Sequence, residues 1–201
     1  MISHHREFIF LHISKCGGTS IESAFKAWRN QYSRDYFYLG KNRQHFLLNE
    51  ILREYPECSG YFKFAFIRNP FSRIVSEYNY ILKEASKALK HPIAHLKGIS
   101  FRDFILDLEK HLNDNAYAYH NLSLCDYLLN KEGELVVDFV GRLENFQEDF
   151  NKVCPNILLP HEFSSGKNKH YTEYYDDETK QIVAEKYAKD IEYFGYEFGE
   201  N

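Results

Sequence analysis

The sequence predicts an α/β domain with a central parallel sheet and flanking helices, because two buried strands are each followed by a loop and a helical pattern. Phe8–Ile13 and Phe62–Ile67 are short runs of mostly large apolar residues, which is typical of buried strands. A pair of glycines follows the first run and an Asn-Pro step follows the second. With 201 residues, 44% hydrophobic and 17% aromatic, the chain is expected to form one globular domain spanning 1–201.

The loop after the first strand has the features of a phosphate-binding loop. Residues 12–20 read His-Ile-Ser-Lys-Cys-Gly-Gly-Thr-Ser. Gly17 and Gly18 let a backbone approach a ligand closely, and Thr19 or Ser20 is expected to cap the helix that follows. The N-terminus of a helix presents free N–H groups and a positive dipole end, so this position favours an anion.

Lys15 adds a full positive charge to this loop, although its place differs from that in nucleotide triphosphatases. Their loop has Lys and Ser/Thr directly after the last glycine of a longer spacing, whereas Lys15 precedes both glycines. For this motif alone, a plain strand–turn–helix with glycine in the turn remains an alternative. The helix after the loop is predicted from apolar residues on one face, at Ile21, Ala24, Phe25 and Trp28.

The second strand leads into a similar arrangement. Asn69 is expected to cap a helix that has Pro70 at its first position. Arg68 then lies at the carboxyl end of the strand, where open α/β sheets bind their ligands, and Ser76 lies nearly two turns into the helix. Two anion-binding strand–loop–helix units in one small domain fit a ligand with two separated phosphate-like groups.

The remaining elements follow from the same patterns. They are a helix over 46–55, an irregular surface excursion over 83–99, a helix capped by Ser100, a strand over Leu135–Val140, a helix over Glu144–Val153, a polar loop over 160–170 and a closing helix over Glu178–Tyr193. The tyrosines at 171, 174 and 175 either stack on a sugar or pack, and packing is favoured.

These motifs resemble those of carbohydrate-type sulfotransferases, Golgi and bacterial, that use 3′-phosphoadenosine 5′-phosphosulfate. Lys15–Ser20 is similar to the family's 5′-phosphosulfate loop, and Phe66–Tyr78 is similar to its 3′-phosphate motif. The likeness continues through Gln44–Phe46, Val137–Asn145, His170–Tyr175 and Asp190–Phe198, and so covers nearly the whole chain. It implies a P-loop-like sulfotransferase fold. Cys16 departs from the family pattern, which has a small residue or threonine there.

The resemblance also implies roles for individual residues. Lys15 would stabilise charge on the leaving phosphate, and Arg68 and Ser76 would hold the 3′-phosphate. The full set of donor-binding residues that it implies is Lys15, Cys16, Gly17, Gly18, Thr19, Ser20, Arg68, Ser76, Ser164 and Lys167. The last two belong to the polar loop over 160–170, which either closes over the nucleotide or is an ordinary solvated loop.

His45 is the candidate general base among ten histidines, because Gln44-His-Phe46 precedes a helix and resembles the family's catalytic-histidine position. A surface or capping histidine is the alternative for His45, and Glu22 or Glu50 could replace it. His12, on the first strand, is expected to be a packed supporting group.

Sulfuryl transfer requires no metal, and no metal motif is evident in the sequence. The four cysteines lack a short metal-ligand spacing and are interpreted as free thiols in a reducing compartment. His4 and His5 are expected in a frayed terminus. Cys16, beside Lys15 and a helix N-terminus, is either the most reactive thiol or an inert one pointing into the core.

Charge and hydropathy exclude several partners. A formal net charge of −4 argues against nucleic acid, and no apolar stretch reaches membrane-spanning length. We expect a cytoplasmic enzyme, in the cytosol or at the membrane surface where glycans are assembled, that transfers sulfonate to a hydroxyl of a carbohydrate or glycoconjugate. The alternatives are a P-loop-type kinase or nucleotide triphosphatase and a catalytically idle nucleotide- or glycan-binding protein.

Overall fold

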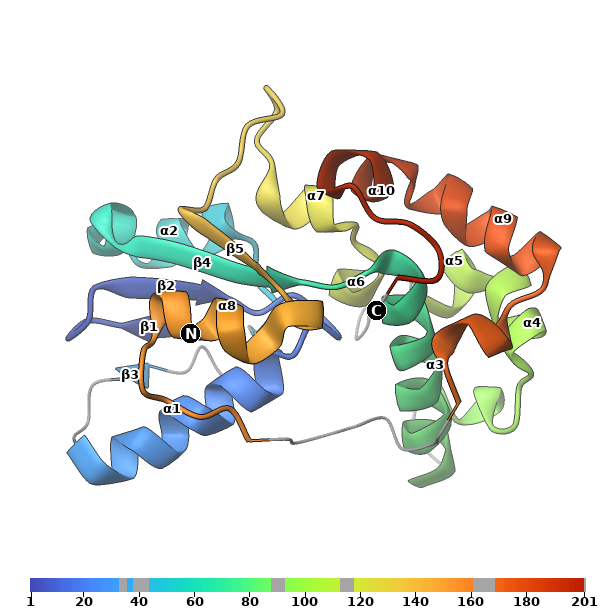
Figure 1. Cartoon of the computed structure of the whole chain (residues 1–201), viewed down its shortest axis with the longest axis horizontal. Helices are drawn as coiled ribbons and strands as arrows, with labels where there is room; N and C mark the ends of the chain where they lie inside the picture. Colours follow the sequence, from blue (N-terminus) through green and yellow to red (C-terminus); the bar gives the residue numbers. More distant parts are fainter. Residues whose placement is uncertain (33–35, 38–43, 88–92, 113–117, 161–168, 201) are drawn as a thin grey trace. The chain divides into compact units, whose positions relative to one another are not determined.

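The computed structural model describes residues 1–32, 36–37, 44–87, 93–112, 118–160 and 169–200. It divides into two compact units (Figure 1). Unit 1 comprises Met1–Arg68 and Asp126–Phe163, and unit 2 comprises Asn69–Cys125 and Ser164–Asn201. The expectation that 1–201 forms one domain stays a prediction, and each unit is described in turn.

Unit 1 is built on a sheet whose strands, in the described residues, have the order β3-β1-β2-β4-β5. The bounds are β1 Ile2–Ser3, β2 Phe8–Leu11, β3 Tyr36–Phe37, β4 Phe62–Ile67 and β5 Phe139–Arg142. β2, β4 and β5 are parallel, which confirms the predicted parallel centre of the sheet, while β1 pairs antiparallel with both β2 and β3. The frayed terminus expected around His4 was wrong, because β1 is paired and Met1 and Ile2 are buried.

Aromatic residues fill the core of unit 1. Phe8 and Phe64 lie on neighbouring strands with ring centroids 5.4 Å apart. Phe25 of α1 (Gly18–Tyr32) packs on Phe8 and on Phe150 of α8 (Phe146–Val153). Both helices lie beside the strands of this unit in Figure 1. These contacts hold α1 and α8 against the strands of unit 1.

Two other parts of unit 1 bear on the predictions. The helix expected over 46–55 is α2 (Leu48–Glu54), and the 3-10 turn η2 (Pro56–Gly60) follows it. The strand expected over Leu135–Val140 begins later, as β5, because Leu135 instead forms a bridge with Leu129. The helix expected over Glu144–Val153 is divided into η4 (Leu143–Asn145) and α8.

Unit 2 is helical in its described residues. Its elements are α3 (Pro70–Lys87), η3 (Ala94–Leu96), α4 (Phe101–Leu106), α5 (Leu108–Leu112), α6 (Ala118–Asn121), η5 (Tyr171–Tyr174), α9 (Asp177–Lys186) and α10 (Ala188–Phe194), and α7 (Leu124–Leu128) contains the unit boundary. The predicted Ser100 cap is confirmed, since its side chain accepts a hydrogen bond from the Asp103 N–H. Tyr171 and Tyr175 pack in the core with Phe71, as favoured above.

Two expectations for unit 2 were wrong. The closing helix predicted over Glu178–Tyr193 is divided at Tyr187 into α9 and α10, because this buried residue leaves the helical conformation. The surface excursion predicted over 83–99 starts as the last turns of α3, and Ile93 and Leu96 are buried. In the described parts of both units, none of the helices combines the length and the apolar character needed to cross a membrane.

Candidate active site

The loop between β2 and α1 adopts a conformation that uses the left-handed region twice. Lys15 has φ 62° and Gly17 has φ 81°. The Gly17 carbonyl accepts hydrogen bonds from the N–H groups of Ser20 and Ile21, so α1 begins at Gly18. The predicted cap at Thr19 or Ser20 was therefore wrong, because the left-handed Gly17 starts the helix earlier. A lysine in this region costs about 1 kcal/mol or more, a strain that is concentrated at functional sites.

The two glycines are needed for contacts with other parts of unit 1. A Cβ on Gly17 would lie 2.6 Å from the Phe146 ring and 2.7 Å from Leu143. A Cβ on Gly18 would overlap the His12 ring. The sequence assigned these glycines to the approach of a ligand, whereas the structure shows that protein side chains pack against them and hold the loop in place.

Arg68, the residue directly after β4, reaches the same loop. Its Nη1 donates a hydrogen bond to the Lys15 carbonyl oxygen at 3.5 Å. β2 and β4 are parallel neighbours, so their carboxyl ends meet at one edge of the sheet. The structure thus brings together two of the cationic residues that the sequence singled out, Lys15 and Arg68, both half-buried.

A chain of hydrogen bonds extends from the end of β2 to α1 and to the segment before α2. The buried His12 donates from Nδ1 to Glu22 Oε1 at 2.8 Å. The Nε2 atom of the Gln44 side-chain amide lies 2.9 Å from the same His12 nitrogen. His45 Nδ1 donates to the His12 carbonyl oxygen at 2.7 Å, and the two rings are edge to face at 4.7 Å.

This arrangement fixes the chemistry available to His45. Because a carbonyl oxygen only accepts, Nδ1 of His45 bears a proton, and in the neutral ring Nε2 has the lone pair that a general base needs. Glu22 is bonded to His12, and Glu50 accepts from the Leu47 N–H as a helix cap. The sequence identified His12 as a supporting group but missed its partners Glu22 and Gln44, since a separation of ten or thirty-two residues is no local signal.

The other predicted residues belong to unit 2, to the loop itself, or to the part of the chain outside the described residues. Ser76 lies on α3 in unit 2, where it is buried, and the predicted Asn69 cap of that helix is confirmed. Cys16 is 1% exposed, which agrees with the inward-pointing alternative, and its reactivity stays a prediction. Ser164 and Lys167 lie outside the described residues.

Comparison with known proteins identifies the family. The model of the Sulfotransferase family matches residues 1–197. An uncharacterized protein of Archaeoglobus fulgidus is 33% identical over 104 residues, which cover 51% of this chain and 72% of that protein. Carbohydrate sulfotransferase 9 of Homo sapiens is 26% identical over 160 residues, which cover 68% of this chain and 34% of the human protein.

The match therefore spans about a third of the length of the human relative. No solved structure shows a significant match to the chain. The family match covers nearly the whole sequence, and the α/β architecture with its loop at the carboxyl ends of parallel strands agrees with it. This chain belongs to the sulfotransferase family, whose members transfer sulfonate groups and generally use 3′-phosphoadenosine 5′-phosphosulfate as the donor.

Proposed function

We propose that this protein transfers sulfonate from 3′-phosphoadenosine 5′-phosphosulfate to a hydroxyl of a carbohydrate or glycoconjugate, in the cytoplasm. The similarity to a human carbohydrate sulfotransferase supports the acceptor class. The observation that supports the donor best is that two cationic residues meet at one sheet edge, where Arg68 Nη1 lies 3.5 Å from the Lys15 carbonyl oxygen.

The motif indicates the donor-binding residues, and the geometry of the loop supports those that belong to it. The N-terminus of α1 has no acidic residue in its first turn, so its N–H groups and dipole favour the 5′-phosphosulfate. The loop backbone from Lys15 to Ser20, which includes Cys16, binds that group. Arg68 binds the 3′-phosphate through charge-assisted hydrogen bonds, and Ser76 adds its hydroxyl. Ser164 and Lys167 are proposed to close over the nucleotide.

The transfer step is a single in-line displacement. The acceptor oxygen forms a bond to sulfur while the bond from sulfur to the bridging phosphate oxygen breaks. His45 Nε2 takes the hydroxyl proton, and Lys15 stabilises the charge that develops on the bridging oxygen. The products are a sulfate ester and 3′,5′-adenosine bisphosphate. The transition state of this transfer is expected to be loose, so that its stabilisation depends on positioning and on charge. No step of the reaction needs a metal ion.

The strand ends favour this reaction over that of a P-loop kinase. Those enzymes hold magnesium with a carboxylate at the end of a strand and a Ser/Thr after the P-loop lysine. Here His12 follows β2, Arg68 follows β4 and Arg142 ends β5. A thermal-shift comparison of 3′,5′-adenosine bisphosphate with ATP plus magnesium separates the two functions: preferential stabilisation by ATP with magnesium would contradict the proposal.

Turnover of labelled donor with a panel of sugar acceptors tests the activity directly. Lys15→Ala should fold and lose about 3 kcal/mol of transition-state stabilisation, which is at least about a hundredfold in rate. Wild-type turnover in the folded variant would refute the role of Lys15. Absence of turnover by the unmodified protein with every acceptor would favour an idle binding protein.

His45→Ala tests the base separately from the donor site. The base contacts the acceptor proton and not the nucleotide, so turnover should fall by about a hundredfold or more while donor affinity stays nearly constant. A fall in donor affinity parallel to the loss of activity would mean that His45 is a binding or structural residue, and Glu22 or Glu50 would then be the next candidates.

A further inference from the structure

A second cluster of reactive side chains lies at the opposite end of the same strands. His4 is in the turn between β1 and β2, and Glu57 and Cys58 are neighbours in η2, just before β4. A backbone hydrogen bond from the Phe62 N–H to the Glu7 carbonyl oxygen, 2.8 Å long, joins these two loops. Parallel pairing of β2 with β4 therefore places His4 beside η2, although 53 residues separate it from Glu57.

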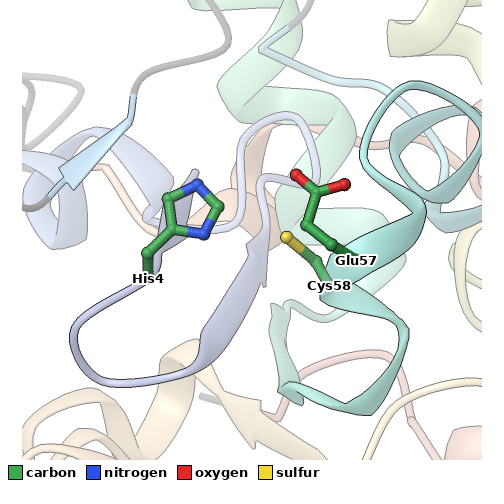
Figure 2. A group of neighbouring side chains, drawn as sticks. All are labelled: His4, Glu57 and Cys58. Atoms are coloured by element: carbon green, nitrogen blue, oxygen red, sulfur yellow. The ribbon is translucent and has the colours of Figure 1, made fainter.

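The three side chains converge on one point. One ligand atom from each residue, a ring nitrogen of His4, a carboxylate oxygen of Glu57 and the Cys58 sulfur, all lie within 4.8 Å of one another. Figure 2 shows the His4 ring and the Glu57 carboxylate on either side of the Cys58 sulfur. Ligands of a tetrahedral zinc ion, at about 2.0–2.3 Å from the metal, are about 3.5 Å apart. His4 and Glu57 are both exposed, so small rotations of their side chains bring the ligand atoms from within 4.8 Å to about 3.5 Å of one another around the buried Cys58.

A neighbouring tyrosine prepares His4 for this role. Its Nδ1 and the Tyr61 hydroxyl are 3.0 Å apart, and the two rings meet edge to face at 5.8 Å. Histidine ligands of metals typically have such a partner, which fixes the tautomer and the direction of the ring.

We propose that His4, Glu57 and Cys58 bind one Zn²⁺ ion, with water at the fourth position. Sulfur, imidazole and carboxylate together suit zinc among the common divalent ions, whereas calcium and magnesium require oxygen ligands. The site is distinct from the transfer loop, because the eight residues from Tyr61 to Arg68 span about 20 Å of extended chain. The ion ties the β1–β2 turn to η2 and takes no part in sulfonate transfer.

Zinc binding by the tag-free protein tests the proposal without any activity measurement. The apo protein is titrated with Zn²⁺ against a chromophoric chelator, and we expect one ion per chain. His4→Ala and Glu57→Gln should each weaken binding by about a hundredfold, since a lost ligand costs at least as much as a lost outer partner. Tyr61→Phe should weaken it by about tenfold. His5→Ala is the matched control, because this neighbouring exposed histidine is outside the cluster.

Cobalt reports on the sulfur ligand directly. Co²⁺ bound at this site should show a thiolate charge-transfer band and the visible bands of tetrahedral coordination, and Cys58→Ser should abolish the former. Since Cys58 is buried and its substitution can harm folding, the exposed His4 and Glu57 variants give an independent result. The proposal is overturned if these two variants bind zinc like the unmodified protein, if His5→Ala weakens binding equally, or if cobalt shows no thiolate band.

Discussion

Arg68→Ala should change which adenosine nucleotide the protein prefers, because Arg68 is proposed to hold the phosphate that AMP lacks. A hydrogen bond to a charged group contributes about 1.5–3 kcal/mol. A loss of about 2 kcal/mol lowers affinity for 3′,5′-adenosine bisphosphate by about thirtyfold. Within the loop, the Lys15 carbonyl oxygen accepts a hydrogen bond from Arg68 Nη1 at 3.5 Å. At the outer limit of hydrogen bonding, it contributes little, so affinity for AMP should change by no more than about twofold.

Calorimetry with both nucleotides measures this difference. Arg142→Ala is the matched control. Arg142 is the last residue of the adjacent strand β5, and its substitution removes the same charge. It should leave both affinities nearly unchanged. Ser76→Ala removes one neutral hydroxyl and should weaken 3′,5′-adenosine bisphosphate by about fivefold, or about 1 kcal/mol. If Arg68→Ala lowered the affinity for the two nucleotides equally, the reasoning would be refuted, and Arg68 would contact the 5′ side of the nucleotide or have a structural role.

Two further predictions concern stability and are checked by urea denaturation. Gly18→Ala forces a methyl group into the His12 ring and should destabilise the fold by about 2 kcal/mol, whereas Gly60→Ala, with nothing within 4 Å of the added Cβ, should not; equal effects would contradict the packing argument. Burial lowers the pKa of His111 in the folded protein below its ordinary value of 6.5, so the unfolded chain binds a proton more readily there. The free energy of unfolding should therefore fall as the pH drops below about 6.5, and it should level off below the folded-state pKa. His111→Phe should flatten that dependence, and an unchanged slope would show that other groups cause it.

The sequence was sufficient to predict those structural features whose determining residues are close together along the chain. The cap at Asn69 and the bounds of β4 follow from the residues at those positions, and the structure confirms both. The place of Arg68 directly after β4 was also predicted from the sequence, whereas its contact with the Lys15 carbonyl oxygen was not.

Other structural features depend on contacts between segments that are distant along the chain, and no local sequence pattern indicates them. The division of the closing helix at Tyr187 comes without a proline or glycine to mark it. The early start of α1 required knowing that Gly17 is left-handed. His4, Glu57 and Cys58 have no metal-ligand spacing along the chain, and only the pairing of β2 with β4 brings them together.

His12 shows why the candidate site depends on such contacts. Its ring lies against Gly18, so it sets the position of the first residue of α1. Its carbonyl oxygen accepts a hydrogen bond from His45 Nδ1, and Glu22 fixes its ring through Nδ1. One buried side chain thus supports both the loop proposed to bind the donor and the residue proposed to take the acceptor proton. Because the two groups share this support within unit 1, a displacement of His12 would disturb donor binding and proton transfer together.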